Sequence, residues 1–246
     1  MPVDVQTGGR GPDLVLLHSL LTDRGAFAAV HEDLARDFRL HLVDLPGYGS
    51  TRTQGESSIE AYADRVAEAV PANAAVLGNG FGGFIAVMLA LRHPAKVAKL
   101  IAAPALAGFP PPAKEPFRIL AKKVSEGGMQ AVLDAAIARM LPPAFIAAHP
   151  DIVAERKSAL AKADPAAFAR ACLALSALDL GNEISKIKSD TLVLVGELDQ
   201  TTPSALAREL AGGIAGARFQ ELAGVGHCPQ IEQPDAFVAA LRGFLE

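Results

Sequence analysis

Leu77-Gly78-Asn79-Gly80-Phe81-Gly82-Gly83 joins a short apolar run to an amphipathic stretch, which is the pattern of a tight turn from a β-strand into a helix. In a G-x-S-x-G turn the residues on both sides of the central one must be small, because larger side chains would collide there. Gly78 and Gly82 meet that requirement. The central residue holds a strained backbone conformation and points its side chain over the end of the sheet. Here that residue is Gly80, so the position carries no side chain.

The same stretch contains a second pattern, because Gly78, Gly80 and Gly83 form the G-x-G-x-x-G fingerprint of dinucleotide-binding turns. That fingerprint belongs to the first βαβ unit and is followed about 20 residues later by an acidic residue that closes a strand. Here the motif lies a third of the way along the chain, and the next apolar run ends at Ala102-Ala103-Pro104 without Asp or Glu. We therefore reject the dinucleotide interpretation and expect no cofactor.

Short apolar runs alternate with amphipathic stretches on both sides of this turn, which predicts βαβ units and a mostly parallel twisted sheet flanked by helices. Runs this short and this apolar are typical of strands covered on both faces. The expected strands are Leu14–Leu17, Leu40–Val43, Ala74–Leu77, Val97–Ala102, Thr191–Val195 and Phe219–Leu222. The expected helices are Ala26–Phe38, Ile59–Val70, Phe84–Arg92, Ser204–Ile214 and Ala236–Leu245.

Residues 109–180, called the cap below, break this alternation because they contain no convincing strand. The segment opens with the proline-rich exit Gly108–Pro116, and Ala-rich helices are expected at Met129–Met140, Pro150–Ala161 and Pro165–Leu178. It follows the carboxyl end of a strand, where α/β sheets bind ligands. We therefore expect a helical cap over a binding site, rather than helices packed beside the sheet, within a single α/β domain of residues 1–246.

The composition is that of an ordinary globular protein, with 50% hydrophobic residues, 20% charged residues and a net charge of -4. A mildly acidic chain has no electrostatic footprint for nucleic acid or an anionic membrane. Its two cysteines, Cys172 and Cys228, are too few for a disulfide framework and have no metal-ligand spacing. With no signal-peptide pattern and no apolar run near the ~20 residues that span a bilayer, we expect a cytoplasmic protein without a metal.

Three further motifs surround the glycine turn. His18-Ser19-Leu20 follows the first apolar run, Asp199 comes just past the run at 191–195, and His227 lies in the loop after the last run. The chain order of glycine turn, acid and histidine is that of the triad in α/β-hydrolases.

On these motifs the sequence resembles the α/β-hydrolase superfamily over essentially its whole length. Within it, residues 18–23, 126–153 and 164–180 are similar to the oxyanion loop and cap of 3-oxoadipate enol-lactonases. The resemblance implies an α/β-hydrolase fold and a small-molecule ester or lactone as substrate. The chain departs from that family at Gly80, where the family has its nucleophilic serine. We therefore expect impaired or absent turnover by the covalent route.

The resemblance also implies roles for individual residues. Asp199 would fix the tautomer of His227, which would then act as general base. The backbone N–H groups of Leu20 and Phe81 are the expected oxyanion hole, with the start of a helix adding favourable potential at Phe81.

We expect structural or surface roles for the other polar side chains near these motifs. We expect the Ser19 hydroxyl to cap a turn and Cys172 to lie in the core. Cys228 should point away from His227. Lys122, Lys123 and Arg139 could meet a substrate carboxylate, but solvated helix faces are the preferred interpretation. The histidines other than His227 are expected to be structural or to lie at the surface.

Three functions stay open on the sequence. The first is a hydrolase of small esters or lactones that lacks its nucleophile. The second is chemistry without a nucleophile, in which the His227–Asp199 dyad deprotonates water or a carbon acid in a direct hydrolysis, lyase or isomerase reaction. The third is a small-molecule-binding protein without turnover.

Overall fold

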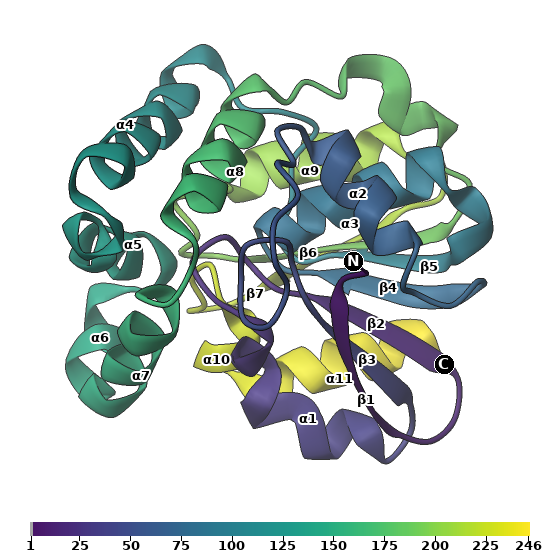
Figure 1. The fold of residues 1–246 in the computed structure, drawn as a ribbon. Helices are drawn as coiled ribbons and strands as arrows, with labels where there is room; N and C mark the ends of the chain where they lie inside the picture. The colour runs from purple at the N-terminus through teal and green to yellow at the C-terminus, as the bar shows by residue number, and fades with distance from the viewer. Residues whose placement is uncertain (1) are drawn as a thin grey trace.

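The computed structural model describes residues 2–246 and forms them around a seven-stranded sheet (Figure 1). The strand order is β1-β3-β2-β4-β5-β6-β7, in which β1 runs antiparallel to β3 and all other neighbours are parallel. The predicted mostly parallel sheet is therefore confirmed. The strands are β1 (Asp4–Gly9), β2 (Asp13–Leu17), β3 (Arg39–Asp44), β4 (Ala74–Gly78), β5 (Val97–Ala102), β6 (Asp190–Gly196) and β7 (Arg218–Leu222).

Helices cover both faces of the sheet, and the cap helices stand off one end of it (Figure 1). In Figure 1, α1 and α11 lie below the sheet, α2, α3 and α9 lie above it, and the cap helices stand at the left. The flanking helices are α1 (Ala28–Ala35), α2 (Ile59–Ala67), α3 (Phe81–Arg92), α9 (Ser204–Gly213), α10 (Pro229–Glu232) and α11 (Pro234–Leu245). The cap helices are α4 (Pro111–Gly127), α5 (Leu133–Met140), α6 (Pro143–Ala148), α7 (Pro150–Leu160) and α8 (Pro165–Ala177).

The strands divide the core into two clusters because successive side chains point to opposite faces. In β2, Val15 and Leu17 join the cluster that contains α3 and the cap. Leu14 and Leu16 join the other cluster, which contains residues of α1 and α11. All four side chains are fully buried. This double coverage explains why the strands read as continuous apolar runs instead of alternating ones.

The edge strand β1 was not expected from the sequence. It pairs with β3 from Asp4↔Asp44 to Gly9↔Arg39. Its sequence, Asp-Val-Gln-Thr-Gly-Gly, has few apolar residues, and most of its side chains are half-buried or exposed. An edge strand pairs with only one neighbour and is less buried than a central strand. Its sequence therefore carries only a weak hydrophobic pattern.

The cap begins differently from the prediction. Helix α4 already starts at Pro111, inside the expected proline-rich exit, and it includes Pro116. Pro111 and Pro112 fit the first turn because the N–H groups there have no partner within the helix, whereas Pro116 lies inside the helix and removes one of its hydrogen bonds. The expected helix Met129–Met140 is instead a short 3₁₀ turn at Met129–Ala131 followed by α5.

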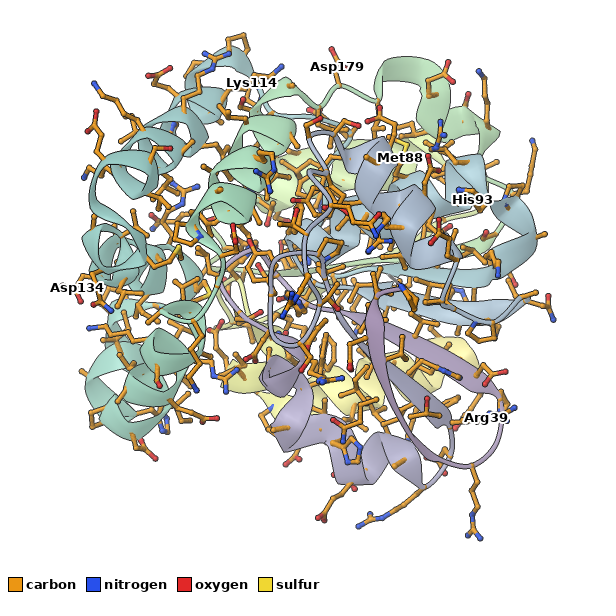
Figure 2. All side chains as sticks on the ribbon, in the orientation of Figure 1. Arg39, Met88, His93, Lys114, Asp134 and Asp179 are labelled. Carbon is orange, nitrogen blue, oxygen red and sulfur yellow. The ribbon has the colours of Figure 1, made fainter. Side chains whose placement is uncertain are left out.

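The cap packs largely on itself. Its helices α4 and α8 are in broad contact, and a 2.6 Å ion pair joins Lys157 of α7 to Asp134 of α5. Asp134 lies on the outer side of the cap, away from the sheet (Figure 2).

None of the helices within residues 2–246 combines the length and apolar character needed to cross a bilayer.

Candidate active site

The glycine turn connects β4 to α3 as the sequence predicts. Gly80 has φ +52° and ψ -116°, a conformation that residues with side chains rarely adopt. A β-carbon at Gly78 would overlap the backbone of Gly82, and one at Gly82 would overlap the Leu17 carbonyl. The strained elbow is therefore retained in full, although no side chain stands at its centre.

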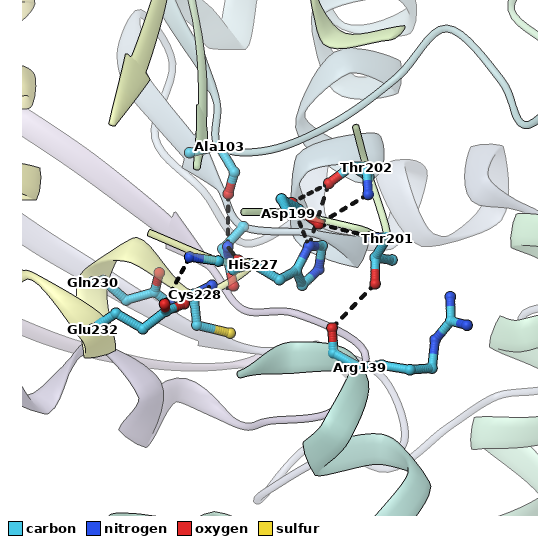
Figure 3. A network of polar contacts seen from close by, with 11 residues as sticks. Ala103, Arg139, Asp199, Thr201, Thr202, His227, Cys228, Gln230 and Glu232 are labelled. Atoms are coloured by element: carbon cyan, nitrogen blue, oxygen red, sulfur yellow. Dashed lines mark hydrogen bonds and ion pairs between the residues drawn. The ribbon is translucent and has the colours of Figure 1, made fainter. Parts of the chain in front are cut away.

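An Asp–His pair lies next to this turn (Figure 3). The Nδ1 atom of His227 is 2.8 Å from Oδ2 of Asp199. The other carboxylate oxygen, Oδ1, accepts the backbone N–H groups of Thr201 and Thr202 at 2.8 and 2.9 Å. The Thr202 hydroxyl also donates to Oδ2. Because a carboxylate only accepts, the Nδ1 atom of His227 carries the proton and Nε2 is the free acceptor.

These contacts set the charge of Asp199. Burial alone would raise the pKa of its carboxyl group. The nearby His227 and the hydrogen bonds from His227 and Thr202 outweigh burial and hold the pKa of Asp199 below its ordinary value. The carboxylate is therefore ionised at neutral pH and orients the imidazole.

The free imidazole nitrogen faces the empty centre of the elbow. A β-carbon on Gly80 would lie 2.8 Å from Nε2 of His227 and 2.5 Å from Oγ of Ser19. The structure thus brings three loops to one point, after β2, after β4 and after β7. Every residue that the sequence assigned to the catalytic centre lies at or next to this point.

The two expected oxyanion donors also meet here. Leu20 and Phe81 both line the cavity above Gly80. Within residues 2–246, neither backbone N–H has an acceptor. The Gly82 N–H bonds the His18 carbonyl at 3.0 Å, which ties the start of α3 to the loop after β2.

His18 holds that loop in place. Its Nε2 atom accepts the Leu45 N–H at 3.0 Å, so Nδ1 carries the proton that binds the Ser19 carbonyl at 2.8 Å. Burial lowers the pKa of His18, which favours the neutral ring that this pattern needs. The structural role expected for this histidine agrees with these contacts.

A buried polar network behind the site was missed by sequence reasoning. The Asn79 amide donates to the carbonyls of Ala103 at 2.7 Å and His227 at 3.1 Å, and its oxygen accepts from Gln230 at 3.1 Å. The Glu232 carboxylate accepts the N–H groups of Gly226 and Cys228, which flank His227 (Figure 3). The available signal was the pair Gln230 and Glu232, two polar residues within five positions after the histidine.

The cavity above Gly80 is narrow and mostly apolar. Its empty volume is about 400 Å³, including the part that opens to solvent. The sheet side supplies Ser19, Gly80 and His227, and the cap supplies side chains from α4, α5 and α8. The apolar wall consists of Leu21, Phe84, Phe109, Phe117, Leu120 and Leu175.

Arg139 corrects one expectation. Lys122 is solvated, with 76% of its side chain exposed, as the preferred interpretation held. Arg139 is instead half-buried and lines the cavity, with its guanidinium 5.5 Å from the centre of the Phe117 ring. Burial lowers the pKa of Arg139. Within residues 2–246, no carboxylate lies within ion-pair distance of this guanidinium.

Ser19 corrects a second expectation, because its hydroxyl does not cap a turn. Its backbone carbonyl takes that role and accepts from Thr22 N–H at 3.3 Å and Thr22 Oγ1 at 3.2 Å. The two cysteines are fully buried, and burial raises the pKa of Cys172 to about 12 and that of Cys228 well above its ordinary value. Cys172 belongs to the core, as predicted.

Possible metal ligands do not cluster in the part of the chain that the structure describes. No group of three or more His, Cys, Asp or Glu residues within residues 2–246 is arranged so that it could hold a metal ion.

Comparison with known proteins places this geometry in a family. A family model described as the alpha/beta hydrolase family matches residues 14–240. A pimeloyl-(acyl-carrier protein) methyl ester esterase from Chromobacterium violaceum is 32% identical and covers 100% of this chain and 99% of its own length. The enol-lactonase from Burkholderia xenovorans LB400 superposes with a TM-score of 0.88 at 29% identity, over 99% of this chain and 96% of its own. A thermophilic esterase from Thermogutta terrifontis superposes with a TM-score of 0.89 at 26% identity, over 99% of this chain and 92% of its own. The chain belongs to the alpha/beta hydrolase family and has the fold that its sequence predicts.

Proposed function

We propose that this protein hydrolyses small carboxylic esters or lactones, with His227 as general base oriented by Asp199. One observation carries the proposal. The free Nε2 atom of His227 lines the cavity and lies 2.8 Å from the position that a β-carbon on Gly80 would take. A general base must reach the proton that it removes, and this nitrogen faces the space where a reacting carbonyl would bind. The printed names of the similar proteins, an ester esterase, an enol-lactonase and an esterase, all concern ester bonds.

Residue 80 takes no covalent part in this proposal. Glycine has no side-chain oxygen, so an acyl-enzyme cannot form there. The Leu20 and Phe81 N–H groups would stabilise the oxyanion that develops on the substrate carbonyl when another group attacks it. The oxyanion hole and substrate binding alone can still accelerate hydrolysis roughly 10³–10⁴-fold over water in serine hydrolases without a triad member. We therefore expect slower turnover than in relatives with the elbow serine.

The preferred substrate carries a carboxylate in addition to the ester. Arg139 is a cation in a mostly apolar cavity and has no acidic partner within residues 2–246. A half-buried charge without a partner is only partly hydrated, and a substrate carboxylate would supply a partner that the guanidinium can bind through two hydrogen bonds. The cap residues 109–180 would close over this substrate. Both cysteines are free and buried, which fits the expected cytoplasmic compartment.

The test is a panel of small esters and lactones, with and without a distal carboxylate, assayed against the native protein and His227→Ala. Product formation that falls about 100-fold or more in His227→Ala supports the proposal. Turnover that is equal in both proteins would show that the dyad is idle. Binding of these compounds without any product after long incubation would instead indicate a binding protein.

A further inference from the structure

We propose that the Ser19 hydroxyl replaces the missing elbow oxygen and is the nucleophile that His227 activates. This inference rests on the ester or lactone hydrolysis proposed above and names the group that attacks the carbonyl. Ser19 lies in the loop after β2 and lines the same cavity as Gly80 and His227.

The backbone of Ser19 is firmly held, whereas its hydroxyl is not. The carbonyl accepts from His18 Nδ1 and from both the N–H and the hydroxyl of Thr22. The residue is 2% exposed, yet its hydroxyl has no hydrogen-bond partner within residues 2–246. Ser19 lines the cavity together with Gly80 and His227. The hydroxyl oxygen is not one of the fully buried side-chain atoms that lack a partner, so it reaches the open space of the cavity and is suited to act on a ligand there.

Gly80 makes room for this hydroxyl. A β-carbon at residue 80 would lie 2.5 Å from Ser19 Oγ, which is closer than such atoms approach, and 3.1 Å from Ser19 Cβ, which is a tight contact. Ser19 therefore occupies part of the volume that a side chain on the elbow needs. The same β-carbon position is 2.8 Å from His227 Nε2, so the hydroxyl and the base flank one point. Hydrogen bonds between such groups often tighten only when substrate binds.

The other nucleophilic groups near the site are engaged or buried. The Thr202 hydroxyl donates to Asp199, and the Thr201 hydroxyl donates to the Arg139 carbonyl (Figure 3). Cys228 is fully buried, and burial raises the pKa of its thiol well above the ordinary value. Among the side chains that line the cavity, Ser19 thus has the one hydroxyl without a partner in the described part of the chain.

The backbone donors suit attack from this position. In an ordinary elbow, one oxyanion donor is the N–H of the residue that follows the nucleophile. Leu20 stands in that relation to Ser19, and Phe81 supplies the second donor from the start of α3. Neither N–H has an acceptor within residues 2–246.

The reaction proceeds in two steps, acylation of Ser19 and hydrolysis of the acyl group. The Ser19 O–H proton passes to His227 Nε2 while Oγ forms a bond to the ester carbonyl carbon. The bond from that carbon to the leaving oxygen then breaks, and the leaving oxygen takes the proton from His227, which leaves an acyl group on Ser19. Water next attacks the acyl carbon, gives a proton to His227 and releases the acid, and Ser19 recovers its proton.

The experiment treats the native protein with a fluorophosphonate probe and locates the adduct by peptide mass spectrometry. We expect one adduct per chain on Ser19. Labelling should be lost in Ser19→Ala and reduced about 100-fold in rate in His227→Ala, because the base activates the hydroxyl. Ser125→Ala, which removes an exposed hydroxyl on α4, is the matched control and should label normally.

Kinetics separate this inference from the proposed function. The inference predicts that Ser19→Ala lowers ester turnover about as strongly as His227→Ala. Absence of an adduct on Ser19, or His227-dependent turnover that survives in Ser19→Ala, would overturn the nucleophile and point to water attack while leaving ester hydrolysis intact. An adduct on Ser19 in a protein that turns over no ester or lactone would support the activated hydroxyl and refute the proposed function.

Discussion

The side-chain amide of Asn79 donates a 3.1 Å hydrogen bond to the backbone carbonyl of His227, although the two residues are 148 positions apart. This bond joins the glycine elbow directly to the loop that carries the imidazole. Asn79 also donates to Ala103 and accepts from Gln230, so its side chain satisfies three buried groups at once. The position of the His227 ring over Gly80 depends on this network as well as on Asp199.

Replacing Asn79 with leucine should destabilise the protein. The substitution leaves the His227 and Ala103 carbonyls and the Gln230 amide without this partner, and each unpaired buried group costs about 1–3 kcal/mol. We expect the free energy of unfolding to fall by about 2–4 kcal/mol, allowing for partial relaxation. Denaturant titration would show a lower midpoint at an unchanged m-value. Gln130→Leu, at an exposed position, is the control, and an equal midpoint in the two variants would contradict the prediction.

Alanine at residue 80 should also be unfavourable. Gly80 has φ +52°, and an added β-carbon would crowd Ser19 and His227. Strained backbone of this kind costs about 1–3 kcal/mol, which corresponds to a fall of several degrees in Tm. Gly212 in α9 offers a matched control, because a β-carbon there meets nothing within 4 Å. Gly212→Ala should leave Tm unchanged or raise it slightly, and a Gly80→Ala protein as stable as native would refute the expectation.

Removing the Arg139 charge should weaken binding of carboxylate substrates selectively. We expect Arg139→Ala to raise KM for an ester with a distal carboxylate about 10–100-fold, the loss of one charge-assisted contact of about 1.5–3 kcal/mol. KM for a neutral ester of the same size should change little. Lys122→Ala removes an exposed cap cation and serves as the control. Equal effects of Arg139→Ala on both esters would show that Arg139 only supports the cap.

Stability should decrease as the pH falls below about 6.5, the ordinary pKa of histidine. Burial lowers the pKa of His18, so the unfolded chain takes up a proton that the folded protein does not. The free energy of unfolding then falls with decreasing pH, by at most about 1.4 kcal/mol per pH unit for one proton. Denaturation midpoints between pH 5.5 and 7.5 measure this slope. His18→Asn keeps a donor for the Ser19 carbonyl and should flatten the slope, whereas His149→Asn, at an exposed site, should not.

Much of the fold could be predicted because its signals are local. Parallel strands buried on both faces produce short apolar runs, so β2 to β7 were found near their observed limits. The elbow was found because only glycine fits beside its centre, where a β-carbon would overlap the backbone. The edge strand β1 and the proline-bearing start of α4 were missed, since an edge strand is only partly buried and prolines are tolerated in a first helical turn.

The features of the candidate site also fall into those that the sequence shows and those that only the structure shows. The sequence by itself determined the glycine at residue 80, the Asp199–His227 order and the loop at Ser19 and Leu20, because those depend on residue type and spacing. Only the tertiary structure decided that the Ser19 hydroxyl lies against the β-carbon position of Gly80, that Arg139 lines the cavity and that Asn79 binds the His227 loop. These relationships join side chains from loops far apart in the chain, and their directions follow from packing the cap and strand ends together, which no local pattern records.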